Sequence, residues 1–180
     1  MGEIIDHAAE YETVHRLAKM LGTAKEDYKT TETYALFTAI LCWVMQRART
    51  PDHHNDLGDA QAQSVKVQLE EQMISDEPWA VDQLQGMSVF EFFKRLRDAV
   101  AHGDSRRIRP LNDNGILKGH SFELRGNNGY QNSTVHLRRT DMGRLGHELA
   151  ELFCQTMRNV PGNAGIEIQG SDIKEEEHVA

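Results

Sequence analysis

The apolar run ALFTAILCWVM, residues 35–45, constrains the fold more than any other stretch of the sequence. Apolar side chains recur there at helical spacing, and Thr30 or Thr31 can cap a helix that stops before Pro51. Because this segment is the most apolar in the chain, we expect its helix at the centre of the hydrophobic core. The run is much shorter than the roughly 20 residues that a membrane-spanning helix needs. The side chains expected in the core are those of Tyr34, Phe37, Ile40, Leu41 and Val44, with Trp43 as a further candidate.

Two other segments show weaker helical patterns. Residues 3–21 place apolar side chains at helical spacing, and Gly22 follows where a glycine often ends a helix. Residues 59–74 form the second pattern, which the sequence DEPW at residues 76–79 interrupts. The apolar positions of this second pattern are Ala62, Val65, Leu69 and Met73.

The most clearly marked helix begins at Ser88. Ser88 and Glu91 form the S-x-x-E pattern of a capping box, apolar residues follow at helical spacing, and Gly103 ends the segment. A last helix is expected to begin at Asp141, which is a suitable N-cap residue. The apolar side chains along one side of this last helix are Leu145, Leu149, Leu152, Phe153 and Met157.

Between these two helices the periodicity changes from helix to strand. Residues 122–125 and 134–138 alternate apolar and polar side chains around the loop GNNGYQNS, which predicts a β-hairpin at about residues 121–139. The expected fold class is therefore mainly α, with four or five helices and a short hairpin before the last one. Residues 1–158 would form this single domain, and residues 159–180 have the acidic composition of a disordered tail.

Size and composition agree with one soluble domain. The chain has 180 residues, of which 39% are hydrophobic, and this is enough for an ordinary core. Its first residues, MGEIIDHAAE, are acidic and unlike a targeting segment, so we expect a cytoplasmic protein that does not enter a membrane. Cys42 and Cys154 show no CxxC spacing and are expected to be reduced, buried side chains.

No motif in the sequence predicts a metal or a cofactor. His53 and His54 stand in the polar stretch PDHHND, but no ligand spacing matches a known metal site, and a loop between helices is the favoured explanation. His120 and His136 lie on or near the expected hairpin strands, and the sequence assigns them no role. Neither a phosphate-binding glycine loop nor a Ser/His/Asp set is found.

Charge is distributed very unevenly along the chain. The net charge at pH 7 is −8, yet residues 94–109 hold six bases and two acids, which is a local charge of +4. The other segments carry −9 over residues 1–93, +1 over residues 110–158 and −4 over residues 159–180. The basic segment is therefore local, and nucleic-acid binding stays open despite the net negative charge.

Arg97 and His102 lie in this basic segment, at the C-terminal end of the helix that has the capping box. Five residues correspond to about 140° around an ideal helix, so a regular helix would not place the two side chains next to each other. They could meet if His102 lies in the turn where the helix unwinds, or if a second copy of the helix supplies the partner across a two-fold axis. Spacing alone also allows a structural explanation, in which His102 caps the helix and Arg97 pairs with Glu91 or Asp98.

The string RDAVAH, from Arg97 to His102, resembles the R-x(4–6)-H motif of HEPN domains, and Asp98 stands where that family commonly has a polar residue. An up-down bundle of four or five helices with the motif late in the chain also resembles that family, over residues 3–158. The resemblance implies a homodimer in which two motif copies form one cleft. It also implies the activity of many members, which are metal-independent ribonucleases that act as toxins or defence proteins. The hairpin at residues 121–139 is an insertion that many members lack.

The chemistry of RNA cleavage suits these residue types. The 2′-hydroxyl of RNA can attack the adjacent phosphorus, which requires a base, an acid for the leaving 5′-oxygen and a cation for the added negative charge. A histidine such as His102 can accept or donate a proton near neutral pH, and Arg97 can hold a phosphate in a bidentate contact. Two copies in a dimer would supply one base and one acid. Asp98 completes the candidate catalytic set.

Other bases of the segment would bind the phosphates of the RNA backbone without reading its sequence. The acidic run EEE at residues 175–177 could mimic RNA and cover these bases in a system controlled by an antitoxin or another regulatory protein. The sequence therefore predicts a homodimeric, metal-independent endoribonuclease. The alternative is a non-catalytic HEPN-like dimeric module that binds a nucleotide or a protein. The bases expected to bind RNA are Lys94, Arg95, Arg106, Arg107 and Arg109.

Overall fold

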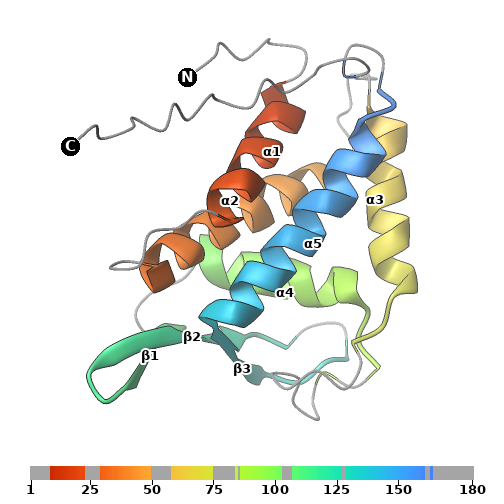
Figure 1. Cartoon of the computed structure of the whole chain (residues 1–180). Coiled ribbons are helices and arrows are strands. Elements are labelled where there is room, and N and C mark those ends of the chain that lie inside the picture. Colours follow the sequence, from red (N-terminus) through yellow and green to blue (C-terminus); the bar gives the residue numbers. More distant parts are fainter. Residues whose placement is uncertain are drawn as a thin grey trace, which may run out of the picture.

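A computed structural model shows a mainly helical protein with a small antiparallel sheet at one end of the helices (Figure 1). The expectation of a mainly α fold is confirmed. The structure describes residues 9–22, 29–49, 58–74, 84, 86–102, 107–126, 129–160 and 163. No helix within these ranges is long and apolar enough to cross a membrane. The elements, in chain order, are α1 (Ala9–Gly22), α2 (Lys29–Arg49), α3 (Asp59–Glu71), α4 (Val89–Ala101), β1 (Ile108–Asp113), β2 (Ile116–Leu124), β3 (Ser133–Arg138) and α5 (Arg139–Met157).

Helix α2 lies at the centre of the core, as its apolar run predicts, and it contacts the other four helices and β2. The prediction of an N-cap at Thr30 or Thr31 is wrong, because the helix already begins at Lys29. The Thr30 hydroxyl instead donates a hydrogen bond of 3.1 Å to the Leu117 carbonyl in the sheet. Trp43 is 46% exposed and does not belong to the core. The buried side chains of α2 include Phe37, Ile40, Leu41, Val44, Met45 and Ala48.

Helices α1 and α3 pack on opposite sides of α5 (Figure 1). Helix α1 confirms most of the predicted segment 3–21, of which residues 3–8 lie outside the described residues. Helix α3 is shorter than predicted, because the chain becomes extended after Glu71 and the Ile74 amide donates to the Met87 carbonyl at 2.9 Å. Met73 is therefore 60% exposed instead of buried, whereas the other three predicted positions of this helix are buried. The predicted break at residues 76–79 lies outside the described residues.

The predicted start of α4 is confirmed. Ser88 is its N-cap, and the Ser88 hydroxyl accepts a hydrogen bond of 3.2 Å from the Glu91 amide. This bond satisfies one of the free amides in the first turn of the helix. The Glu91 carboxylate pairs with Lys94 at 2.8 Å. The expected stop at Gly103 lies outside the described residues, and α4 ends at Ala101.

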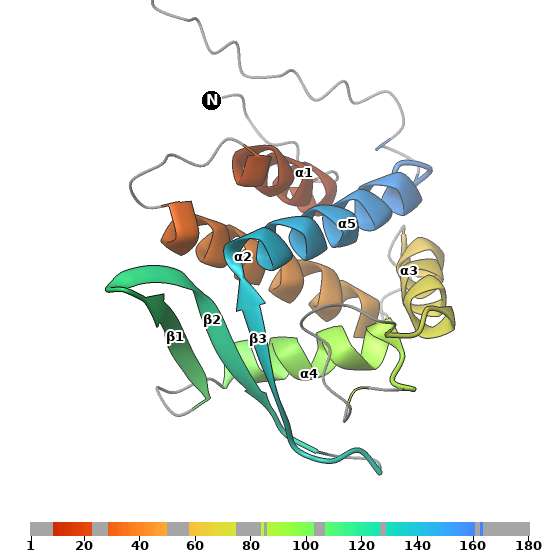
Figure 2. The same cartoon turned by 60° about the horizontal axis from the view of Figure 1, so that its bottom comes forward.

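The sheet has the order β1-β2-β3 and is antiparallel throughout. Strands β2 and β3 confirm the predicted hairpin, whereas β1 was not predicted and extends out of the basic segment. Strands β1 and β2 are joined by a tight turn in which Asn114 and Gly115 have φ angles of 50° and 77°, as the asparagine-glycine pair of a hairpin turn requires. One face of the sheet packs against α2, α4 and α5, and Figure 2 shows that the other face is not covered by a helix.

Helix α5 follows β3 without a loop and begins at Arg139. The prediction that Asp141 is the N-cap is wrong by three residues, because Arg138 occupies the cap position. Asp141 still stabilises this end of the helix, since its carboxylate accepts a hydrogen bond of 2.8 Å from the Arg138 amide. The predicted apolar side is buried at Leu145, Leu149, Phe153 and Met157, and Leu152 is half-buried.

Candidate active site

The C-terminal end of α4 places His102 at the surface. His102 is the C-cap residue of the helix, with φ −112° and ψ 13°, and its backbone amide donates to the Asp98 carbonyl at 3.1 Å. Its side chain is exposed. The helix is therefore already unwinding at His102, which removes the constraint of the regular 140° separation from Arg97.

Arg97 is held in one orientation by two neighbours. Its Nη2 donates to the side-chain oxygen of Gln46 on α2 at 2.7 Å, and its Nη1 lies 3.1 Å from an Asp98 carboxylate oxygen. The Arg97 side chain is 21% exposed, so part of the guanidinium faces solvent. Each Nη carries two hydrogens, and these two contacts use one on each nitrogen. Arg97 can therefore keep these partners and still donate two hydrogen bonds to a bound phosphate.

Asp98 orients Arg97 in the structure. Its side chain is 36% exposed and pairs with the neighbouring guanidinium. Glu91 and Asp98 were the two acids expected to pair with Arg97. The structure shows the pair with Asp98, whereas Glu91 pairs with Lys94. This pair partly neutralises the charge of Arg97, which reduces the cost of holding a cation that is mostly buried.

The prediction that Arg95 binds RNA is wrong, because its side chain points into the protein. Arg95 is 3% exposed, and burial lowers the pKa of its guanidinium. Its Nη2 donates to the carbonyls of Leu124 at 3.1 Å and Gln131 at 2.8 Å, and its Nε donates to the carbonyl of Arg125 at 2.8 Å. The guanidinium also lies 5.8 Å from the centre of the Tyr130 ring. Through these hydrogen bonds, Arg95 connects α4 to the end of β2 and to the loop between β2 and β3.

The other predicted phosphate-binding residues are separated by the fold. The Lys94 side chain is 19% exposed and is engaged with Glu91, so it is poorly placed for a second anion. Arg106 lies outside the described residues. Arg107 is half-buried just before β1, and Arg109 is exposed on β1. Arg107 and Arg109 therefore belong to the sheet and not to the end of α4.

The two histidines of the hairpin lie on opposite faces of the sheet. His120 stacks on Tyr34 of α2 with ring centres 4.0 Å apart, and burial lowers the pKa of the imidazole. His136 is exposed on the outer face. Sequence reasoning gave His136 no role, although the period-two alternation of TVHLR already placed it opposite Val135 and Leu137.

The described residues contain no group of three or more His, Cys, Asp or Glu side chains arranged to hold a metal ion. His53 and His54 lie outside those residues. Cys42 and Cys154 are free and only half-buried, whereas buried side chains were expected. Burial raises the pKa of the Cys42 thiol and raises that of Cys154 to about 12, which keeps both as unreactive thiols near neutral pH.

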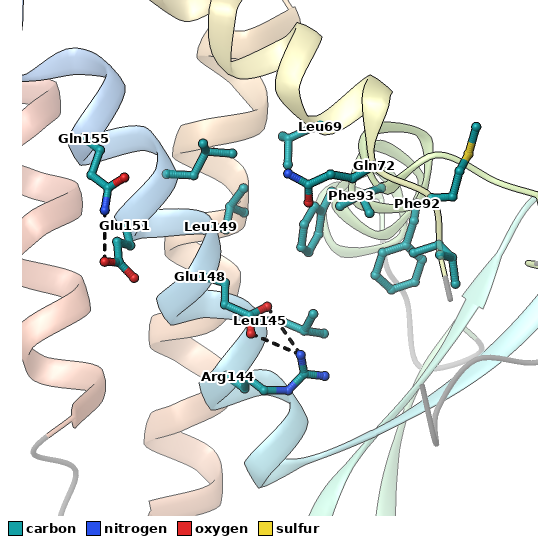
Figure 3. Close-up of a pocket in the computed structure, with 14 residues that line it drawn as sticks. Leu69, Gln72, Phe92, Phe93, Arg144, Leu145, Glu148, Leu149, Glu151 and Gln155 are labelled. Atoms are coloured by element: carbon teal, nitrogen blue, oxygen red, sulfur yellow. Dashed lines mark hydrogen bonds and ion pairs between the residues drawn. The ribbon is translucent and has the colours of Figure 1, made fainter. Parts of the chain in front are cut away.

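A separate apolar groove of about 490 Å³ runs between α3, α4 and α5. Figure 3 shows Leu69, Phe92, Phe93 and Leu149 around it. Along α5 its edge is polar, with an ion pair of 3.1 Å between Arg144 and Glu148 and a hydrogen bond of 3.0 Å between Gln155 and Glu151 (Figure 3). The two carboxylates of the groove, Glu148 and Glu151, are engaged with Arg144 and Gln155, and no His, Cys, Ser or Lys side chain is among the described residues that line it.

No protein-family model, curated protein or solved structure with which the chain was compared matches it. The function of the chain is therefore inferred from its own residues and their geometry.

Proposed function

We propose that the protein is a cytoplasmic, metal-independent endoribonuclease of the HEPN type, with one composite active site in a homodimer. The single observation that carries the proposal is the end of α4, where Arg97 is held in place by Gln46 and Asp98 and His102 is exposed at the C-cap. A cation held in place and an exposed imidazole at the end of the same helix are the groups that phosphodiester cleavage needs.

Arg97 would bind the phosphate that is attacked. Its two remaining Nη hydrogens can reach the non-bridging oxygens, and its charge opposes the negative charge that develops on them in the transition state. Because Gln46 and Asp98 already fix the guanidinium, little side-chain entropy is lost when the substrate binds. Gln46 and Asp98 are positioning residues in this mechanism.

His102 from one subunit would accept the proton of the 2′-hydroxyl as its oxygen attacks phosphorus. His102 from the other subunit would donate a proton to the 5′-oxygen as the bond between that oxygen and phosphorus breaks. The products are a 2′,3′-cyclic phosphate and a 5′-hydroxyl, so atoms and protons balance without a water molecule in this step. One chain carries a single copy of His102, and for this reason the site is complete only in the dimer.

The test is incubation of mixed-sequence RNA with the purified protein in EDTA. We expect wild type to cleave, and we expect His102→Ala and Arg97→Ala each to lose at least about 100-fold in rate. His147→Ala is the matched control, because His147 is an exposed histidine on α5. Absence of cleavage by wild type, or equal loss in the His147→Ala control, would refute the proposal.

The apolar groove between α3, α4 and α5 favours one alternative, a non-catalytic dimeric module that binds a protein partner. An antitoxin or other regulatory protein could use the same groove. Under this alternative, Leu152→Asp in the half-buried rim of the groove abolishes partner binding, and His102→Ala has no effect on it.

A further inference from the structure

The two faces of the small sheet differ in burial and in polarity. On the inner face, Phe122 of β2 and Val135 and Leu137 of β3 are fully buried against the helices. On the outer face, the alternate residues of the same strands are polar and include Thr134 and His136, which are exposed. None of the described helices covers the outer face (Figure 2), so these helices leave it open to a ligand.

The strand register places basic residues of the two outer strands on either side of small residues in the middle one. Arg109 of β1 is opposite Ser121 of β2, and Ser121 is opposite His136 of β3. In the next row, Gly119 of β2 is opposite Arg138 of β3. A β-carbon at Gly119 would collide with the backbone of β3, so this part of the face carries no side chain. At this end of the sheet lies a hollow of about 840 Å³, lined by His136 and Arg138 of β3 and by Leu111, Asn112 and Asp113 of β1; Arg109 is not among its lining residues.

An irregularity in the register adds a further cation. Leu111 of β1 is opposite Gly119, while the next residue, Asn112, is opposite Leu117. Lys118 is therefore an extra residue in β2, as in a β-bulge, and this bulge lets its side chain line the same hollow as His136 and Arg138.

The basic side chains of the hollow are available to a ligand. Lys118, His136 and Arg138 are exposed, and none of their side chains makes a hydrogen bond or ion pair with any other residue in the described part of the chain. Two acids, Asp113 and Asp141, also line the hollow. The Asp141 carboxylate already accepts the Arg138 amide, so it is partly neutralised at the start of α5.

We infer that this hollow binds the phosphodiester backbone of a single RNA strand that enters the proposed active site. The outer face offers cations at fixed spacing and no Phe, Tyr or Trp side chain among its described residues, so it suits phosphates and not stacked bases. Contacts of this kind are independent of sequence and depend strongly on salt.

The chain between the motif and the hollow limits how far apart they lie. Nine peptide steps separate His102 from Leu111, which lines the hollow, and a chain of that length spans at most about 32 Å. The inference rests on the proposed function for the identity of the ligand, but binding can be measured when cleavage is blocked.

The test uses a labelled 20-nucleotide RNA with 2′-O-methyl groups, which has no 2′-hydroxyl to attack and stays intact. Its affinity would be measured by fluorescence anisotropy at several salt concentrations. We expect Lys118→Gln and Arg138→Gln each to weaken binding by about threefold to tenfold and to reduce the salt slope by about 0.7. The double variant should lose about the product of the two effects. Lys66→Gln, which removes a cation of α3 paired with Glu70, is the matched control and should bind as wild type does.

Three outcomes would overturn the inference. These are a double variant with wild-type affinity and salt slope, an equal loss in the Lys66→Gln control, and polyglutamate that binds the hollow more tightly than RNA. Melting temperatures of all variants would show whether they are folded. Wild-type protein that binds the modified RNA but leaves unmodified RNA intact in EDTA would refute the proposed nuclease and leave this inference intact.

Discussion

At the scale of single residues, two arginines of one helix have opposite roles. Arg95 and Arg97 are two positions apart, so they point about 200° apart around α4. Arg95 points into the core and donates to backbone carbonyls, whereas Arg97 points along the surface towards Gln46. The sequence does not show which of the two arginines is buried. The partners of Arg95 are backbone carbonyls about 30 or more positions later in the chain, and every residue type has such a carbonyl.

Arg95→Met is expected to destabilise the protein by roughly 2–4 kcal/mol, because the carbonyls of Leu124, Arg125 and Gln131 lose their donor. The measurement is urea unfolding followed by circular dichroism. Arg95→Lys keeps the charge but cannot reach three carbonyls at once, and an intermediate loss is expected for it. An Arg95→Met protein within about 0.5 kcal/mol of wild type would contradict the structural role.

His120 is expected to make the fold sensitive to acid. Burial against Tyr34 lowers its pKa below the ordinary value of 6.5 in the folded state, so the unfolded chain takes up the proton first as the pH falls. Stability contributed by the neutral ring is therefore fully present above pH 6.5 and is lost as the pH drops through the folded pKa. Burial lowers the pKa of His15 as well, and His15 adds to the same loss.

In His120→Phe, the melting temperature should fall less between pH 7.5 and pH 5.5 than it does in wild type. Tyr34→Phe keeps the imidazole and its stacking partner, and it is the control that should retain the wild-type pH dependence. An unchanged pH dependence in His120→Phe would show that the burial of this ring has no effect on acid stability.

At the scale of elements, the sequence predicts the helices, but it does not predict how the strands pair with one another. The helices α2, α4 and α5 follow from apolar residues at helical spacing, and the Ser88 cap was readable because its partner is three residues away. Strand β1 was missed because IRPLND has only two half-buried side chains and a proline, although DNG at its end is a hairpin turn signal. The bulge at Lys118, which completes the outer hollow, comes from pairing between strands and has no local pattern.

Ser88→Ala should destabilise the protein by about 1 kcal/mol, since the first turn of α4 loses the acceptor for the Glu91 amide. Ser88→Asp supplies another acceptor at the same position and should stay close to wild type. Chemical denaturation of the three proteins measures the difference. Equal stability of Ser88→Ala and wild type would mean that the cap observed at this position is not important for the fold.

At the scale of the whole molecule, the proposed site requires a second copy of the chain. Trp43 and Gln46 are three residues apart on α2 and share one side of it, and Gln46 touches Arg97. The 46% exposed Trp43 ring therefore lies on the same side of α2 as the motif. A two-fold axis that brings two Arg97 side chains together would cover this ring.

Trp43→Glu should shift the protein from dimer to monomer and abolish RNA cleavage together. Sedimentation equilibrium gives the mass, which should be about twice 20.4 kDa for wild type and close to 20.4 kDa for the variant. Val67→Glu changes a 47% exposed apolar residue on α3 and is the control that should remain dimeric. A monomeric wild type that still cleaves RNA would rule out the composite site.

Arg97 and His102 at the end of α4 are proposed to cleave RNA through its own 2′-hydroxyl. The most direct measurement is mass spectrometry of RNA fragments produced in EDTA by wild type and by His102→Ala. The mechanism predicts fragments with 2′,3′-cyclic phosphate and 5′-hydroxyl ends from wild type and intact RNA from the variant. Intact RNA from both proteins, or fragments with 5′-phosphate ends, would contradict it.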